Sequence, residues 1–455
     1  MATKKLGLPS AIAVAVGLIV ASSCLLLLGT GTGLAGRGFI VSMGIVLFLN
    51  MLLALSFNEL YSLMPSVDGG MGQYTKAGLG AVPSIVSNIS AYVMVNLLAA
   101  SVEIAMCGMV LNETFFPSVP YPVISLIILV LLALVNIRGI NIFSKLQNIV
   151  VALLLLSLVG MGLISTLKLG TGVLIPASEQ TAPVVTGFGG YLSLSAMAFW
   201  LFIGIEFVIP VAKDLKNPKR DVPLAMVLGI AILFIVQSLM SSGMTNYVTL
   251  EELSTSSIPH MVFAEKLLGR PGQIWMGIVT VLAAISTANT VFAGIPRVLQ
   301  GMAENELLPK AFALTNKKNV AYVGLLFLAI GNFILIATKV TTSAGLSTML
   351  LAASCFWLTS YILISITVLV LRKRFPNHPS RNKKLMLWGI PQIITIIGNI
   401  YMIYSIAEGD QRILIYKVFG IILVIMIVFS VIWVKFVKKM PMFKGATLEE
   451  LNAMK

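Results

Sequence analysis

Charged residues are scarce in this chain of 455 residues: they make up 11% of it, whereas hydrophobic residues make up 58%. A water-soluble protein carries about 25% charged residues, so this composition excludes a water-facing surface over most of the chain. Long apolar runs such as SLIILVLLALV and FGIILVIMIVFSVIWV approach the roughly 20 residues that cross a hydrocarbon core. The sequence therefore predicts an all-α membrane protein that spans the bilayer many times.

Cysteine and histidine are also rare. The three cysteines, Cys24, Cys107 and Cys355, fall within predicted spans and form no C-x-x-C pair, so neither a disulfide nor a metal site is indicated. With two histidines and no converging nucleophile, base and metal ligands, we expect neither an enzyme nor a cofactor. A channel is disfavoured because no pore ring or filter is repeated. A membrane sensor that does not transport stays open as an alternative.

A glycine-rich stretch near the N-terminus matches a nucleotide-binding pattern in the wrong context. Gly31-Thr-Gly33-Leu-Ala-Gly36 fits G-x-G-x-x-G, which in dinucleotide-binding proteins follows a strand and opens a solvated helix. Here, predicted membrane spans lie on both sides. We therefore expect these glycines to permit a turn or close helix contact, and we expect no bound nucleotide.

Hydropathy predicts twelve spans. They cover 8–34, 38–64, 83–111, 121–141, 144–167, 188–211, 222–248, 273–300, 320–338, 344–371, 386–407 and 413–435. With this even number both termini lie on one side, which also collects most basic residues, including the runs KDLKNPKR and RKRFPNHPSRNKK. The positive-inside rule makes that side cytoplasmic, in the inner or plasma membrane of the cell. The net charge of +14 is explained by this topology, and it favours attraction to anionic membrane lipid. No nucleic-acid partner is therefore expected.

Acidic residues inside predicted spans are functional candidates, because an ionisable group in mid-membrane costs about 2.5–3.5 kcal/mol. For Glu59, at the end of span two, a structural cap or anchor is favoured. Glu103, midway along span three, has three open interpretations: pairing with a cationic substrate group, titration, or a hydrogen bond to a neighbouring helix. Glu206 lies near the middle of span six between Gly204 and Pro210, which weaken the helix. It either satisfies freed N–H groups or, as we favour, acts as a proton-coupled gate.

Spans one and six show matching irregularities. Span one contains the small polar island Ala21-Ser22-Ser23, and serine hydroxyls bend helices by bonding to the preceding turn. Span six contains Gly204. An inverted repeat of five helices brings two such breaks together at mid-depth, where the N-termini of half-helices meet an anionic group.

Other residues at similar levels have two interpretations each. Trp200, shortly before Gly204, either covers a bound substrate or packs, and Phe356 is a further aromatic candidate. Ser286 and Thr287 either coordinate a cation or hold helices together.

Three blocks of sequence resemble the amino acid–polyamine–organocation transporters. They are SFNELYSLMPSVDGGMGQYTKAGLG after span two, FIGIEFVIPVAKDLKNPKRDVP at span six and PRVLQGMAENELLPKAF after span eight. The resemblance covers nearly the whole chain and is specific for the family but not for the substrate. It implies a LeuT-like five-plus-five inverted repeat with two further helices, divided into 1–167, 168–371 and 372–455. It also implies alternating access around spans one, three, six, eight and ten.

The resemblance implies a binding site as well. Trp200, Ile203 and Glu206 are similar to the aromatic, small apolar and acidic positions of bacterial arginine–agmatine antiporters, and Ser101 falls near their polar contact in span three. The implied substrate-binding set is Ala21, Ser22, Ser23, Ser101, Glu103, Trp200, Ile203, Gly204 and Phe356, with Glu206 as the gate.

Two departures from the family pattern bear on substrate and coupling. The family usually has G-S-G in span one, whose bare backbone binds a substrate carboxylate. Here Ala21-Ser22-Ser23 narrows that pocket and supplies hydroxyl donors, so an amine or a modified amino acid becomes a candidate beside a standard amino acid. Many relatives carry in span five a lysine that replaces a bound sodium ion. Leu154 occupies that position here, so lysine-based coupling is not supported.

The function expected from these observations is secondary active transport of an amino acid or related amine, coupled to protons, by a monomer or homodimer. Exchange of substrate for product without obligatory proton coupling is the alternative.

Overall fold

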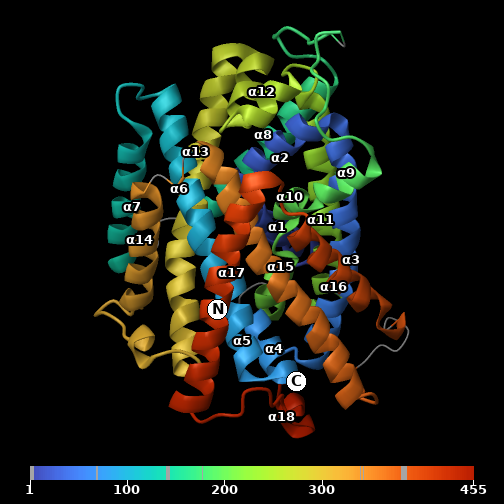
Figure 1. Ribbon diagram of the computed structural model, residues 1–455, viewed down its shortest axis with the longest axis vertical. Helices are drawn as coiled ribbons and strands as arrows, with labels where there is room; N and C mark the ends of the chain where they lie inside the picture. The colour runs from blue at the N-terminus through green and yellow to red at the C-terminus, as the bar shows by residue number, and fades with distance from the viewer. Residues whose placement is uncertain are drawn as a thin grey trace.

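The protein is all-helical over the residues that the computed structural model describes, which are 5–67, 70–139, 144–176, 178–338, 340–341, 343–380 and 387–454 (Figure 1). The first half contains α1 (Leu8–Ile19), α2 (Ser22–Ala35), η1 (Gly36–Gly38), α3 (Phe39–Leu63), α4 (Met71–Leu79), α5 (Ala81–Asn88), η2 (Ile89–Met94), α6 (Val95–Thr114), α7 (Tyr121–Ile137), α8 (Ser144–Thr166), α9 (Gly187–Ser193), α10 (Ser195–Phe199), η3 (Trp200–Phe202) and η4 (Ile205–Asp214). The second half contains α11 (Pro218–Met244), α12 (Leu250–Thr255), α13 (Pro259–Glu304), η5 (Lys310–Ala313), α14 (Tyr322–Ala337), α15 (Ser343–Arg374), η7 (Leu387–Gly389), α16 (Ile390–Tyr404), α17 (Gly409–Val431), η8 (Ile432–Val437) and α18 (Leu448–Ala453).

Many of these helices suit a membrane. Among the described residues, eight helical stretches are long and apolar enough to cross one, and nine are if the bent pair Gly187–Ser193 and Ser195–Pro210 forms one span. The same part of the chain holds three shorter apolar helices, Leu8–Gly17, α7 and α14. Side chains such as Ile127, Ile421 and Ile425 are more than half exposed on the outer helices, where contiguous apolar surface is stable against lipid. The prediction of a multi-pass membrane protein is confirmed; the predicted span ends at 140–141 and 386 lie outside the described residues.

The glycines of the nucleotide-like pattern serve a turn and close packing, as predicted. Gly36 has φ 56 and ψ −139 and separates α2 from α3 within one long apolar stretch. A Cβ atom at Gly33 would lie 2.3 Å from the backbone nitrogen of Ser254 in α12, and one at Gly31 would lie 2.3 Å from the Phe39 ring. Side chains at either position would therefore push α2 away from its neighbours.

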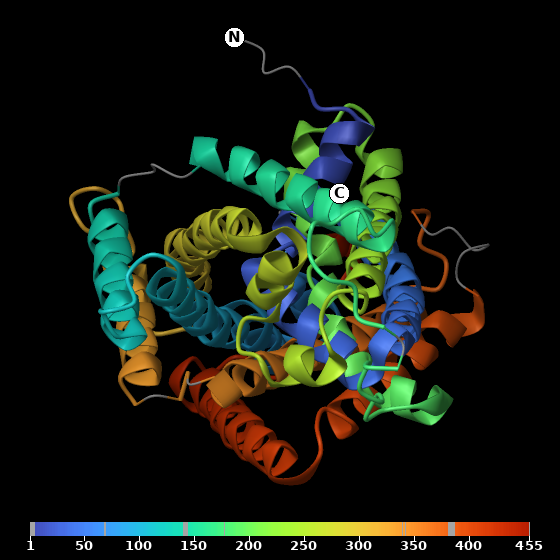
Figure 2. The same cartoon turned by 90° about the horizontal axis from the view of Figure 1, so that it is seen from above.

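The interrupted helices lie at the centre of the bundle. Seen from above, α2, α6 and α10 occupy the middle, whereas α7, α14 and α17 lie at the periphery (Figure 2). Helix α14 packs against α7, and α15 packs against both α16 and α17. An ion pair joins α3 to α15, with Glu59 Oε2 and an Arg372 guanidinium nitrogen 2.5 Å apart and both side chains about nine-tenths buried. This contact agrees with the structural role favoured for Glu59.

The C-terminal segment docks against the end of the bundle that carries α4, at the bottom of Figure 1. The Ala446 N–H donates to the Ala77 carbonyl at 2.8 Å, and the Ser66 N–H donates to the Met454 carbonyl at 3.1 Å. The opposite end carries α9 and α12 (Figure 1). These two ends are called the α4 end and the α12 end below.

Candidate functional site

The first predicted helix interruption lies between α1 and α2. Val20 and Ala21 are extended, with ψ values of 115 and 162, so α1 ends at Ile19 and α2 begins at Ser22. This interruption is called the first break. The prediction of a break in span one is confirmed. The break divides the polar island, because Ala21 belongs to the extended segment whereas Ser22 and Ser23 are the first residues of α2.

Glu103 of α6 fills the N-terminus of α2. Its Oε1 accepts a hydrogen bond from the Ser23 backbone N–H at 2.9 Å, and its Oε2 accepts one from the Ser22 hydroxyl. The Glu103 side chain is completely buried. The N–H groups of a first helical turn have no partner inside the helix, so this carboxyl group satisfies donors that the break exposes. The hydrogen bond to a neighbouring helix, one of the three interpretations of Glu103, is present, and pairing with a substrate and titration stay predictions.

The second break lies in span six. Ile203 is extended with ψ 137, and Gly204 is left-handed with φ 96, between the short helices η3 and η4. A Cβ atom at position 204 would lie 2.4 Å from the Phe207 ring, so both conformation and space favour glycine there. The ten residues of η4, which include Pro210, form a 3-10 helix, and such helices are uncommon beyond three or four residues. The predicted weakness at Gly204 is confirmed.

Amide side chains from two other helices satisfy the carbonyls that the second break frees. Asn50 of α3 donates to the Phe202 carbonyl at 3.2 Å, and Gln237 of α11 donates to the Leu201 carbonyl at 3.0 Å. Both amides are buried. Non-helical backbone is stable at membrane depth only where neighbouring groups satisfy it. The sequence analysis missed both residues, although an amide inside an apolar span is a signal for such a bond.

Tyr361 of α15 connects the second break to Glu206. Its hydroxyl accepts a hydrogen bond from the Gly204 N–H at 3.2 Å and donates one to Glu206 Oε2 at 2.8 Å. The other carboxyl oxygen, Oε1, is buried and accepts no hydrogen bond from another described residue. Glu206 therefore reaches the Gly204 N–H through Tyr361. Sequence analysis missed Tyr361 too, although a phenol in mid-span needs a polar partner.

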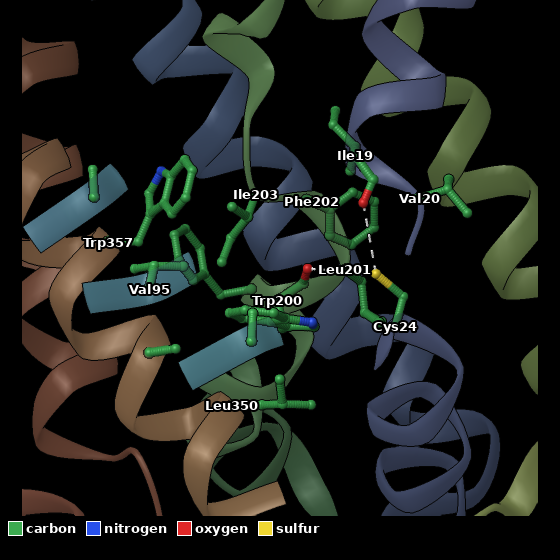
Figure 3. Close-up of a cluster of buried hydrophobic side chains, with 14 of the residues drawn as sticks. Ile19, Val20, Cys24, Val95, Trp200, Leu201, Phe202, Ile203, Leu350 and Trp357 are labelled. Carbon is green, nitrogen blue, oxygen red and sulfur yellow. Dashed lines mark hydrogen bonds between the residues drawn. The ribbon is translucent and has the colours of Figure 1, made fainter. Parts of the chain in front are cut away.

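Trp200 joins the two breaks. Its indole N–H donates to the Ser23 hydroxyl at 3.1 Å. Its backbone carbonyl lies 3.9 Å from the Cys24 sulfur, which also lies 3.7 Å from the Ile19 carbonyl at the end of α1. In Figure 3 the Trp200 indole nitrogen points toward Cys24, and the dashed line from Cys24 to Ile19 crosses the first break. The two breaks are thus one hydrogen-bonded cluster.

Two adjoining cavities lie beside this cluster. One, called the Ala21 cavity, has a volume of about 360 Å³ and lies between α1, α8, η4 and α13. The other, called the Glu206 cavity, has a volume of about 390 Å³ and is lined by residues of α4 and α5 and by the end of α13. They share Tyr92, Phe207, Pro210 and Val298. The two cavities therefore adjoin, and together they extend from the first break toward the α4 end; the pair is called the hollow below.

The two cavities differ in charge. None of the described residues that line the Ala21 cavity is charged. The Glu206 cavity is lined by Glu206 and, nearer the α4 end, by Lys76 and Arg297. Among the described residues, no three His, Cys, Asp or Glu side chains come together as a metal site.

Residues 6–412 match the sequence profile of the family described as amino acid permease. The chain belongs to the amino acid permease family. It is 23% identical over 441 residues to the branched-chain amino acid permease BcaP of Bacillus subtilis, covering 90% of this chain and 89% of that protein. It is 23% identical over 360 residues to the putrescine transporter PotE of Escherichia coli, covering 76% of this chain and 78% of that one.

A solved structure shares the fold of the permease. A mutant of the Eremococcus coleocola manganese transporter superposes with a TM-score of 0.59 at 14% identity, covering 98% of this chain and 94% of that one. At this identity the likeness shows the fold alone. Family membership confirms the resemblance to amino acid–polyamine–organocation transporters and the expectation that the protein is a transporter, not an enzyme.

The structure of the permease brings most of the candidate residues together. Ser22, Ser23, Glu103 and Trp200 are linked by hydrogen bonds. Ile203 and Gly204 form the second break, and Ala21, Ser286 and Thr287 line the Ala21 cavity together with Leu154.

Two candidate residues do not join the cluster. The Ser101 hydroxyl donates to the Leu98 carbonyl of its own helix at 2.7 Å. The Phe356 ring packs edge-on against Phe419 of α17, with ring centres 5.0 Å apart. Substrate contact by these two residues stays a prediction.

Proposed function

We propose that the permease is a secondary active transporter of an amino acid or related amine that works by alternating access. The twelve spans predicted from the sequence would form a five-plus-five inverted repeat with two further helices, divided at 1–167, 168–371 and 372–455. Support comes from the equivalent places of the two breaks, in the first helix of each proposed repeat. The relatives named for branched-chain amino acids and for putrescine support both substrate classes.

The observation that carries this proposal is the hollow beside two broken helices. The Ala21 cavity is lined by Val20 and Ala21 of the first break and by Phe207, which packs near Gly204 of the second. Broken spans of this kind present backbone ends to a solute at mid-depth. With the α4 end cytoplasmic, as the positive-inside rule predicts, this hollow would be the substrate path of an inward-facing state.

Glu206 is the proposed proton-coupled gate. It lines the hollow, it has one buried oxygen without a described partner, and Tyr361 links it to the Gly204 N–H. A carboxyl in a buried site is suited to take up and release a proton. Protonation of Glu206 would change the bond that it accepts from Tyr361, so the proton would act directly on the second break.

Uptake into proteoliposomes tests the gate. Wild-type uptake should rise when a proton gradient directed inward is imposed, and Glu206→Gln should transport with no response to that gradient. Glu265→Gln is the matched control, because the Glu265 side chain is exposed near the α12 end. An unchanged gradient response in Glu206→Gln would remove the gating role.

Counterflow without a pH gradient separates the two coupling modes. An exchanger should take up labelled substrate without a pH gradient only when unlabelled substrate is inside, whereas an obligate proton symporter should also load empty proteoliposomes when a proton gradient directed inward is imposed. Binding of a ligand without any flux in either assay would favour the sensor alternative.

A further inference from the structure

We propose that Glu103 excludes substrates that carry a carboxylate, so that the permease takes an amine in preference to the amino acid with the same side chain. This inference depends on the proposed function for the place of the substrate beside the first break.

The N-terminus of α2 is built as an anion site. It is the start of a helix of 14 residues, whose aligned peptide dipoles and unpaired N–H groups attract negative charge. The residue that precedes it, Ala21, has no side chain that can accept a bond from these groups. By contrast, α12 is capped locally, since the Thr249 hydroxyl accepts a hydrogen bond from the Glu252 N–H at 3.3 Å.

The permease supplies its own carboxylate to this anion site. Glu103 lies 80 residues away from Ser23 in the sequence, on α6, and takes the Ser23 N–H and the Ser22 hydroxyl together. A substrate carboxylate would need the same two donors. Both donors already bond to Glu103, whose side chain is completely buried, so they are not available to a second acceptor. The substrate would have to displace a group that is already fully desolvated and paired.

Charge acts in the same direction. Glu103 is bonded to two serines, Glu206 is bonded to Tyr361, and no described basic side chain pairs with either carboxyl group. Glu206 lines the hollow and Glu103 is buried at the first break. The basic residues of the hollow, Lys76 and Arg297, lie nearer the α4 end, so the region beside the breaks suits the ammonium group of an amine. A carboxylate placed next to Glu103 would compete with it for the same two donors, and whenever Glu103 is ionised it would also meet a like charge, a contact that costs several kcal/mol.

Matched ligand pairs test this inference on the wild-type protein. Putrescine and L-ornithine differ only by the α-carboxylate, as do 3-methylbutylamine and L-leucine. In competition counterflow the amine of at least one pair should inhibit at a concentration about a hundredfold lower than its amino acid, which is the ratio that a penalty of several kcal/mol implies.

Variants at position 103 test the residue itself. Glu103→Ala should vacate the anion site and improve inhibition by the amino acid of the pair at least about tenfold, with less effect on the amine. Glu103→Gln keeps the size of the side chain and one acceptor oxygen, so inhibition by the amino acid should improve less than in Glu103→Ala. Glu113→Ala is the control, because Glu113 is an exposed residue on the same helix and should leave the ratio unchanged.

The outcomes separate this inference from the proposed function. If wild-type protein transports amino acids as well as the matched amines, or if Glu103→Ala folds and leaves the ratio unchanged, Glu103 does not select against carboxylates although transport stands. If no ligand of either pair binds or undergoes counterflow, both proposals are contradicted. Should Glu103→Ala fail to fold, the wild-type ratio and Glu103→Gln still decide.

Discussion

Replacing Tyr361 with phenylalanine tests how the second break is stabilised. The change deletes one hydroxyl and two hydrogen bonds, so the Gly204 N–H loses its partner and Glu206 loses its donor. Hydrogen bonds between helices in membranes average about 0.6 kcal/mol and reach about 1.7, because the unfolded chain also finds partners. A buried polar group left unsatisfied costs about 1–3 kcal/mol. With two groups affected, the free energy of unfolding should fall by about 2–3 kcal/mol.

A reversible SDS titration in mixed micelles measures this free energy. Tyr404→Phe is the matched control, because the Tyr404 side chain is 65% exposed and its substitution should change stability by less than about 0.5 kcal/mol. If Tyr361→Phe and Tyr404→Phe have the same free energy of unfolding, the Tyr361 hydroxyl does not stabilise the second break. That result would also contradict the proposed link between Glu206 and Gly204 through Tyr361.

The same titration tests three further contacts. Gly33→Ala should cost about 1–3 kcal/mol, because its new methyl group would lie 2.3 Å from a backbone nitrogen of α12. Gln237→Leu leaves the Leu201 carbonyl without its donor and should cost about 1 kcal/mol. Glu59→Gln weakens the ion pair with Arg372 and should cost about 1–3 kcal/mol. Losses no larger than that of an exposed control would contradict each assignment.

Much of the helical framework could be predicted from the sequence because a bilayer demands long apolar helices. The interruption of span six could also be located from the sequence, because Gly204 adopts a left-handed conformation that only glycine takes easily. The exact start of α2 could not be predicted. It begins at Ser22 because Glu103, far away in the sequence, accepts the hydrogen bonds of its first turn.

The polar side chains that hold the second break were harder to find. Asn50, Gln237 and Tyr361 are single polar residues inside apolar spans, and the sequence signals only that each needs a partner. Which carbonyl or amide each one reaches depends on the packing of α3, α11 and α15 around η3, which no local pattern encodes. Ser101 illustrates the reverse case, because its hydroxyl bonds within its own helix.

Ligand protection of a cysteine at the first break tests the central claim most directly. Ala21 lines the hollow, and the native Cys24, Cys107 and Cys355 are at most 5% exposed, so Ala21→Cys should dominate labelling by a maleimide. Saturating putrescine should slow this reaction and leave labelling of Leu314→Cys, on an exposed loop, unchanged. If neither putrescine nor any transported amine or amino acid protects Ala21→Cys, the substrate does not bind between the two breaks.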